Sequence, residues 1–388
     1  MNTSAPRWAV VVGIGTTQTL AWGSTYYLPA ILADDVALGT GLTRSWVFGA
    51  FSASLLVAAG CGPVIGRIID RRGGRQVLTL SNLVMAIGLS VLAAAQGAVG
   101  LCAAWAMLGV GMALGLYDAA FATLAALYGS EARGAITGIT LIAGFASTIG
   151  WPLTAALDAE LGWRGTCVVW AALHCAVGLP VNALVVPRVI PRGVEHRPSE
   201  ASGWKPRKEM LLLAVIFAAS WFVTGAMAAH FPALLERAGT SHRAAIAAGA
   251  LIGPAQVGAR LLEFVVMRRA HPLVSARLAA ALHPLGAILL AAMGAPAAAL
   301  FALLHGAGNG LLTIARGTVP LAVFGPIGYG ARTGLLGAPA RAAQAAAPLL
   351  FGILLDEWGE YALIISGGLS ILALIALLNL RVKAPDAA

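Results

Sequence analysis

The chain alternates between long runs of apolar residues and short polar turns. Most runs hold about 20 residues or more, and a helix of that length rises by about 30 Å, the thickness of a membrane's hydrocarbon core. The runs lack the strict alternation of polar and apolar positions that marks the strands of a membrane barrel. Each run therefore predicts a transmembrane helix. The predicted helices cover residues 8–33, 43–69, 76–95, 101–128, 134–157, 166–186, 210–235, 244–267, 274–293, 296–324, 334–355 and 361–380.

The predicted helices fall into two groups of six. Between the groups, residues 187–208 are rich in proline and charge and carry no apolar stripe, which is typical of a linker. We therefore expect an N-terminal six-helix bundle over residues 1–186, a cytoplasmic linker over residues 187–208 and a C-terminal six-helix bundle over residues 209–388. The predicted fold class is an all-α integral membrane protein with about 12 transmembrane helices.

Composition and charge agree with this assignment and add an orientation. Hydrophobic residues make up 59% of the chain and charged residues 11%, and the mean hydropathy is +0.84, more apolar surface than a soluble core can bury. Lysine and arginine are concentrated in the turns on the side of the N-terminus, which predicts cytoplasmic N- and C-termini. The turns of the other side hold only Arg44, Arg164, Arg237 and Arg243. The net charge of +9 is spread over many turns, so no nucleic-acid partner is predicted.

The sequence shows no signs of an enzyme or a metalloprotein. Cys61, Cys102, Cys167 and Cys175 all lie within apolar runs, where they form neither a disulfide framework nor a zinc-binding spacing. No nucleotide-binding loop and no catalytic triad can be recognised. We therefore predict no metal, no cofactor and no enzymatic activity.

The turn after the second predicted helix has the sequence GRIIDRRGGR, residues 66–75. It closely resembles the loop after the second helix of major facilitator superfamily transporters. The two halves of the chain also resemble each other, since YLPAIL at 27–32 matches HFPALL at 230–235, and RIID at 67–70 matches RLLE at 260–263. The resemblance implies a parallel repeat of two six-helix halves that works by alternating access, with a substrate site at their interface near the midplane.

The same resemblance implies a gating role for this turn, which in the family is thought to hold the two halves together when the cytoplasmic side is closed. Gly66 has no side chain, so another helix can come close to it. Asp70 can accept hydrogen bonds from a helix N-terminus or an arginine. The alternative is a solvated turn that only fixes topology. The predicted gating residues are Gly66, Asp70, Arg71, Gly73 and Arg75.

Two further patterns carry a family resemblance. The first predicted helix contains Gly23, Tyr26, Tyr27 and Pro29, which resembles bacterial relatives of the monocarboxylate porters. The GWR sequence at 162–164 resembles a turn common in the superfamily. These patterns favour a bacterial transporter of small solutes.

Ionisable side chains inside the predicted helices are the candidates for coupling, because a charge at membrane depth is costly and usually faces water or a partner. Asp118 is the candidate proton carrier, and Glu263 is a second one. The alternatives for Asp118 are a fixed ion pair with an arginine of the other half and local packing beside Tyr117. Arg260 and Glu263 are three residues apart, so a pair between them is also open.

Arginines in the second half are the candidates for solute binding, since a planar guanidinium donates two hydrogen bonds to a carboxylate or oxyanion at once. Arg341 lies about 12 Å from the cytoplasmic end of its helix, so it can also snorkel to the interface. His230 occupies the position equivalent to Tyr27, whereas His174 and His305 are expected to be packing residues. The predicted substrate-binding residues are Arg316, Arg260, Arg341, Tyr26, Tyr27, His230 and Asn309.

Together these features predict a secondary active transporter that moves a small anionic or polar solute across a bacterial inner membrane. It is expected to be a monomer in the lipid bilayer, with protons as the coupling ion. The main alternative is an efflux permease for toxic compounds of the drug or arsenical type, because residues 308–316 and 340–341 loosely resemble bacterial permeases that export arsenicals. A passive uniporter and a transporter-like receptor are further alternatives.

Overall fold

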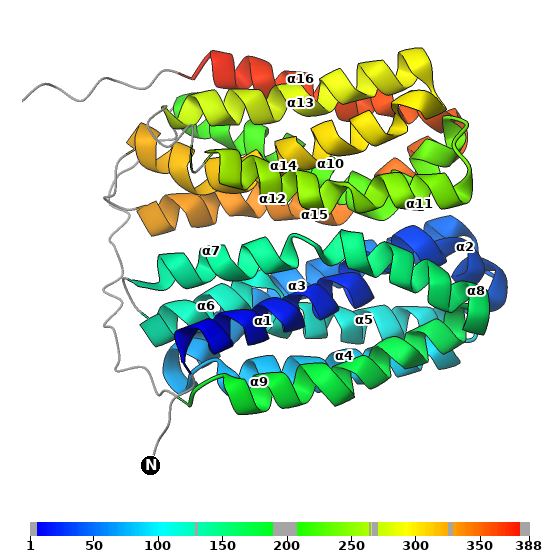
Figure 1. The fold of residues 1–388 in the computed structure, drawn as a ribbon, viewed down its shortest axis with the longest axis vertical. Helices are drawn as coiled ribbons and strands as arrows, with labels where there is room; N and C mark the ends of the chain where they lie inside the picture. Colours follow the sequence, from blue (N-terminus) through cyan, green and yellow to red (C-terminus); the bar gives the residue numbers. More distant parts are fainter. Residues whose placement is uncertain are drawn as a thin grey trace, which may run out of the picture. The chain divides into compact units, whose positions relative to one another are not determined.

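A computed structural model describes residues 6–128, 131–188, 208–263, 265, 271–324 and 329–380. The described residues form helices and turns, without strands. The chain divides into two compact units, Met1–Glu195 and His196–Ala388 (Figure 1). This division falls within the predicted linker at 187–208, most of which lies outside the described residues, so the linker itself stays a prediction. We describe each unit separately.

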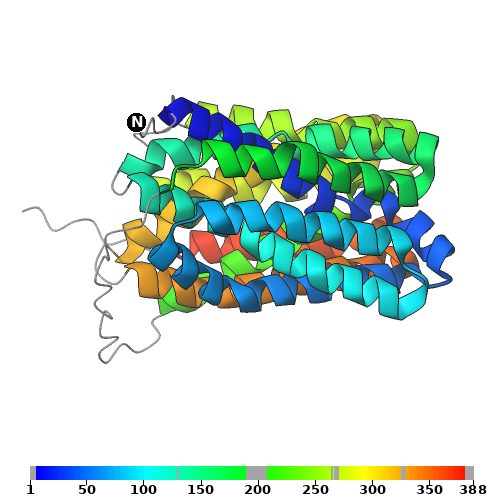
Figure 2. The same ribbon diagram turned by 90° about the horizontal axis from the view of Figure 1, so that it is seen from below.

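The N-terminal unit is built of α-helices and two short π-helices, η1 and η3. Figures 1 and 2 agree that α3, α4 and α5 run side by side, and α4 also packs against α8. The elements are α1 (Arg7–Ala21), η1 (Trp22–Tyr26), α2 (Pro29–Thr40), α3 (Arg44–Arg72), α4 (Arg75–Ala94), α5 (Gly97–Gly115), α6 (Tyr117–Tyr128), α7 (Ala132–Ala143), α8 (Ala146–Leu173), η3 (His174–Gly178) and α9 (Leu179–Val185). Gly162, with φ of 68°, divides α8 into two helices.

The C-terminal unit is also helical. In it α10 packs against α15 and α16, α13 against α14 and α16, and α12 against α14. The elements are α10 (Lys208–Arg237), α11 (His242–Ala250), α12 (Ile252–Leu262), α13 (Pro272–Met293), η5 (Ala295–Ala297), α14 (Ala298–Phe324), α15 (Tyr329–Trp358), η6 (Gly359–Ala362) and α16 (Leu363–Leu378).

The predicted membrane-spanning character is confirmed. Among the described residues, nine segments are long and apolar enough to cross a membrane. Two of them, Gly134–Val185 with 52 residues and Leu336–Leu378 with 43, each contain two of the predicted helices. The first predicted helix, 8–33, is not among the nine, since η1 divides it and α1 alone has 15 residues. The structure is therefore consistent with twelve crossings.

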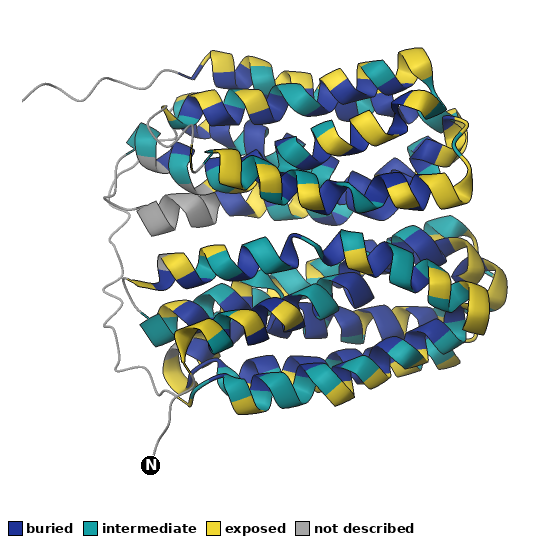
Figure 3. Ribbon diagram, in the orientation of Figure 1, coloured by how far each residue is buried: buried dark blue, intermediate teal, exposed yellow. Residues whose placement is uncertain are grey.

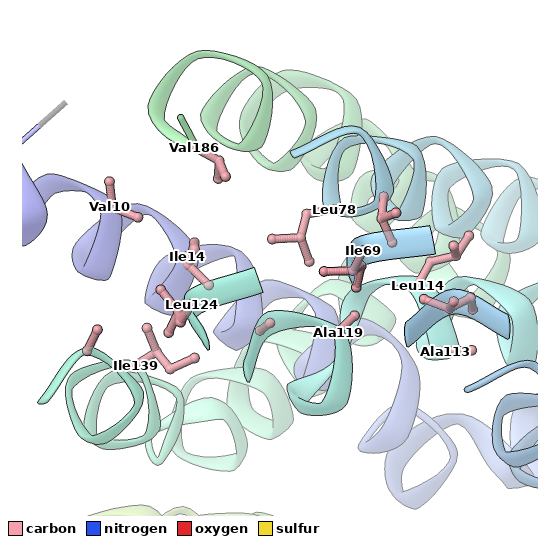
Figure 4. Packing of buried hydrophobic residues seen from close by; sticks show 14 residues of the cluster. Val10, Ile14, Ile69, Leu78, Ala113, Leu114, Ala119, Leu124, Ile139 and Val186 are labelled. Carbon is pink, nitrogen blue, oxygen red and sulfur yellow. The ribbon is translucent and has the colours of Figure 1, made fainter. Parts of the chain in front are cut away.

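Each unit has its own apolar core. Figure 4 shows Ile69, Leu78, Leu124 and Ile139 pointing toward one another in the N-terminal unit, and all four are at most 1% exposed. Figure 3 shows that exposed residues alternate with buried ones along the helices, as expected when one face of each helix packs inward. Ile69 lies within the 66–75 segment, in the last part of α3, and Leu78 follows it in α4, so the core holds the helix on each side of the turn in place.

Buried polar side chains of the N-terminal unit bond to one another. His174 Nδ1 donates to Asn82 Oδ1 at 2.9 Å, and its Nε2 lies 2.8 Å from Ser24 Oγ. The amides of Asn82 and Asn182 both donate to the Leu78 carbonyl at 2.9 Å. A buried polar group without a partner costs about 1–3 kcal/mol, so this network stabilises the packing of η1, α4, η3 and α9. His174 is thus a hydrogen-bonded packing residue.

The GWR turn joins the ends of two other helices. Arg164 Nη1 donates to the carbonyls of Ala93 at 2.6 Å and Ala95 at 3.0 Å, and its Nη2 donates to the Gly39 carbonyl at 3.1 Å. Its guanidinium carbon lies 4.0 Å from the centre of the Trp163 ring. Carbonyls at a helix C-terminus have no partner within the helix, so Arg164 caps the ends of α4 and α2.

Glycines in the 66–75 turn have different roles. Gly73 has φ of 79°, a conformation that favours glycine, and it ends α3. A Cβ atom built on Gly74 would overlap the Thr123 side chain of α6. A Cβ on Gly66 would meet no described atom within 4 Å. Gly74 thus makes a close contact with α6, and the close helix approach expected at Gly66 stays a prediction.

We predict that Gly74→Ala lowers the apparent melting temperature of the purified protein, because forcing a methyl group into a packed site costs about 1–3 kcal/mol. The matched control is Gly62→Ala in α3, where a Cβ would meet nothing within 4 Å. We expect Gly62→Ala to be neutral or stabilising, since alanine is the better helix former by about 1 kcal/mol. Equal melting temperatures for the two variants would contradict the proposed Gly74–Thr123 contact.

Candidate functional site

One face of α14 carries a polar stripe. Asn309, Thr313 and Arg316 are spaced by four and three residues, so they follow one another along this face. Thr313 and Arg316 are exposed and Asn309 is partly buried. The guanidinium carbon of Arg316 lies 4.4 Å from the centre of the Trp221 ring of α10, a cation–π contact. Two predicted substrate residues, Asn309 and Arg316, thus belong to one surface of the C-terminal unit.

Arg260 of α12 reaches this stripe from the neighbouring helix. Its Nη2 donates to Thr313 Oγ1 at 3.2 Å and to Gln256 Oε1 at 3.4 Å. The Thr313 hydroxyl in turn donates to the Asn309 carbonyl at 2.9 Å. Arg260 is therefore tied to α14 one helical turn from Arg316. The structure brings these two predicted arginines to the same part of the unit.

Glycines allow α12 and α14 to come this close. A Cβ atom on Gly310 would lie 2.5 Å from the Gln256 carbonyl oxygen, and one on Gly306 would lie 2.6 Å from that of Ile252. Real Cβ atoms do not approach oxygen so closely, so only glycine fits at these two positions. The small residues near Arg316 thus position the helix from which Arg260 extends.

The other predicted residues of this unit have different surroundings. Glu263 accepts a hydrogen bond from Ser275 Oγ at 3.4 Å. Arg341 folds back along α15, with Nη1 3.0 Å from the position that a Cβ of Gly337 would take. The fully buried His230 donates from Nε2 to the Pro348 carbonyl at 2.7 Å. This bond joins α10 to α15, as expected of a packing residue.

In the N-terminal unit, aromatic rings gather around η1. The Trp22 ring lies 5.0 Å from that of Tyr117 and 4.9 Å from that of Tyr26. Tyr27 is partly buried, and its ring lies 5.5 Å from that of Trp151. Single π-turns inside α-helices occur frequently at functional sites. The predicted residues Tyr26 and Tyr27 thus belong to an aromatic cluster, although Tyr26 itself is only 3% exposed.

Asp118 lies in the first turn of α6, because the predicted helix 101–128 is interrupted just before it. Leu116 is extended, with ψ of −171°, and separates α5 from α6. Asp118 follows two residues later and is exposed. A carboxylate is favoured near a helix N-terminus, where the backbone N–H groups give partial positive charge.

The predicted gating residues are only partly characterised. Arg71 is exposed at the end of α3, and Arg75 is partly buried at the start of α4. The side chain of Asp70 lies outside the described part of the structure. The gating roles of Gly66, Asp70, Arg71, Gly73 and Arg75 stay a prediction. Among the described residues, no three His, Cys, Asp or Glu side chains come close enough together to hold a metal ion.

A sequence model of the Major Facilitator Superfamily matches residues 11–304 of the chain. The chain belongs to the major facilitator superfamily. The match covers most of the chain, including the 66–75 turn, and it ends at residue 304, within the first two turns of α14. Members of this superfamily are transporters, so the protein is a multi-pass membrane transporter and not an enzyme.

Solved structures of other transporters show the same fold. A bacterial homologue of the human lysosomal transporter Spinster, inward-facing and occupied, matches with a TM-score of 0.69 at 16% identity, covering 96% of this chain and 95% of its own. The nucleoside transporter NupG matches with a TM-score of 0.77 at 12% identity, and the match covers 96% of this chain and 98% of NupG. The peptide transporter POT matches with a TM-score of 0.71 at 14% identity, and the match covers 95% of this chain and 93% of POT. No curated protein matches the sequence.

We predict that the polar stripe of this superfamily member, and Asp118 of the N-terminal unit, are accessible to water. In a background without the four native cysteines, Thr313→Cys and Asp118→Cys should react with a charged maleimide at least about tenfold faster than the controls, because the reactive thiolate forms in water. The controls are Leu303→Cys, at a position that is apolar and 42% exposed, and the buried Leu311→Cys and Ala120→Cys.

The Leu303 control separates two kinds of exposure. A residue that faces lipid is exposed in the structure but should not react with a charged reagent. If Thr313→Cys reacted as slowly as Leu303→Cys, the stripe would face lipid and could not bind a solute from water.

Proposed function

We propose that the protein is a secondary active transporter that moves a small anionic or polar solute across a bacterial inner membrane by alternating access, coupled to protons. The observation that carries this proposal is the hydrogen bond from Arg260 to Thr313, one turn of α14 from Arg316. It assembles two arginines and several neutral polar groups on one surface of a unit that is otherwise strongly apolar.

The cost of charge in a membrane supports this interpretation. Residues 295–316 form one of the membrane-length segments, yet they end in the exposed Thr313 and Arg316. Ionisable residues within such segments usually face a water-filled cavity or a partner, because exposure to lipid costs several kcal/mol. A surface that must stay hydrated is suited to receive a polar solute.

The chemistry of arginine indicates which solute. A guanidinium group keeps its charge and presents five N–H donors in a plane, which matches the two oxygens of a carboxylate or oxyanion. The contact with the Trp221 ring and the bond to Thr313 hold the two guanidinium groups in place. Arg341 contacts its own helix and is the weakest of the three arginine candidates.

Protons are the proposed coupling ion, with Asp118 as the carrier and Glu263 as a second candidate. Asp118 is exposed at the start of α6, and Tyr117 beside it contacts Trp22 of the π-turn. A carboxyl group next to a local break in a helix can respond to motion of that helix. The monomeric state and the cytoplasmic termini also belong to this proposal.

We predict that an anion drives proton movement in liposomes that contain the protein and a pH-sensitive dye. The panel includes small carboxylates, inorganic oxyanions and cationic drugs. Arg316→Gln and Arg260→Gln should each weaken the apparent anion affinity about 10- to 100-fold, because a hydrogen bond to a charged group contributes about 1.5–3 kcal/mol. Asp118→Asn should abolish proton movement.

The matched control is Arg243→Gln, which removes an exposed arginine in the first turn of α11. It should behave as the wild type. If only cationic or neutral compounds moved protons, and Arg316→Gln also behaved as the wild type, the anion proposal would be wrong. The protein would then be an efflux permease for neutral or cationic toxic compounds.

A further inference from the structure

Two buried histidines of the C-terminal unit bond directly to each other. Nδ1 of His283 in α13 lies 3.0 Å from Nδ1 of His305 in α14, and the ring centroids are 5.0 Å apart at an angle of 72°. The side chains are 4% and 5% exposed. Sequence patterns suggested only a packing role for His305 and gave no role to His283. A direct contact between two imidazoles, however, limits how many protons they can hold.

The hydrogen bond requires one Nδ1 to carry a proton and the other to accept it. In the neutral pair, the donor ring therefore has an unprotonated Nε2, whereas the acceptor ring has a protonated Nε2. One additional proton can bind at the unprotonated Nε2 without breaking the bond. A second one would have to occupy the accepting Nδ1, which would break the bond and place two positive charges side by side. The pair thus forms a site for one proton.

A small cavity adjoins the histidine pair. Its volume is about 30 Å³, which is enough for a water molecule. The polar residues that line it are His283, His305, Ser220, Thr224, Asn309 and Ser370. His283 Nε2 is buried and has no hydrogen-bond partner among the described residues. When His283 is the ring that donates from Nδ1, this Nε2 carries no proton and is free to take one.

The rest of the surroundings is apolar. The Phe301 ring lies 5.5 Å from that of His283, and the Phe231 ring lies 6.0 Å from that of His305. Other charged or titratable side chains described on the helices that pack against the pair do not line the cavity. They are Lys208, Glu209, His230, Glu236 and Arg237 on α10, His242 and Arg243 on α11, Arg260 on α12, Arg277 on α13, Arg316 on α14, and Arg341, Asp356 and Glu357 on α15.

We propose that His283 and His305 form a buried proton-binding site that takes up one proton from water at His283 Nε2 and couples it to anion binding. A hydronium ion in the cavity gives its proton to Nε2 and becomes water, so one O–H bond breaks and one N–H bond forms. The Nδ1–Nδ1 hydrogen bond persists through this step.

The proposed coupling between the proton on the histidine pair and a bound anion rests on the proposed transport of an anion. Asn309 lines the same cavity and lies one turn from His305, and it is joined to Thr313 and to Thr224 by hydrogen bonds. A proton on the histidine pair adds a positive charge one turn from the polar stripe, which favours an anion there. By linkage, a bound anion then favours the proton to the same extent.

The proton site can be tested without any solute, by NMR of the protein in lipid nanodiscs with ¹⁵N-labelled histidine between about pH 4 and pH 9. We expect the signals of His283 and His305 to change together at one midpoint, with the uptake of one proton. His283→Gln and His305→Gln should each abolish this shared transition. His174→Gln, which removes a buried histidine of the other unit, should preserve it.

Two NMR outcomes would overturn the site. Either the two rings show no change over this range, or they take up one proton each at midpoints of their own. In both cases anion-driven proton movement through Asp118 would still stand as a separate result, so the proton site and the transport proposal can fail independently.

The coupling is tested in the liposome assay. His283→Gln should reduce anion-driven proton movement at least about tenfold or shift its pH midpoint by about one unit, whereas His174→Gln should not. If the pair titrates but His283→Gln moves protons as the wild type does, the coupling to the anion is wrong. If the pair titrates and no anion moves protons, the transport proposal fails and the proton site alone is supported.

Discussion

Within hydrocarbon, a polar group must find its partner inside the protein, because neither water nor lipid can supply one at low cost. This constraint explains the arrangement of the described polar residues. Where α5 ends at Leu116, the carbonyl of Gly115 accepts a hydrogen bond from the side chain of Gln18. Arg164 likewise binds carbonyls at two helix ends. At these helix ends, a side chain from another helix binds carbonyls that have no partner within their own helix.

The same constraint decides how much of the fold can be predicted from sequence. The apolar runs identify the helices, because their length and composition follow directly from crossing a membrane. The breaks within them are harder to foresee. Gly162 and Pro29 are residues that signal a break, but Leu116 is not, and its extended conformation depends on neighbours such as Gln18 that come from a distant part of the chain. Local propensity carries no information about such a partner.

In the candidate site, too, some residues can be predicted from the sequence and others cannot. The cost of burying charge makes Arg260 and Arg316 visible in the sequence. Thr313 was not foreseen, since threonines in membrane helices commonly bond to their own backbone, and Thr313 does so as well. The glycines of the 66–75 turn make the same point. The sequence singles out Gly66 for a close approach, whereas the close contact with Thr123 at Gly74 depends on how α6 packs beside the turn, which the local sequence does not reveal.

The role of α14 follows from the angular positions of its residues. His305, Asn309 and Arg316 lie within one sector of the helix, since their spacings of four and seven residues are close to whole turns. Gly306 and Gly310 face α12, and Gly308 faces α13, where a Cβ would lie 2.9 Å from the Ala279 carbonyl oxygen. The helix is therefore held by backbone contacts on its glycine faces, and its polar sector contacts side chains of α10 and α13. The Arg260–Thr313 bond joins α14 to α12 and the histidine pair joins it to α13, so a movement of α14 against both neighbours would alter the two contacts together.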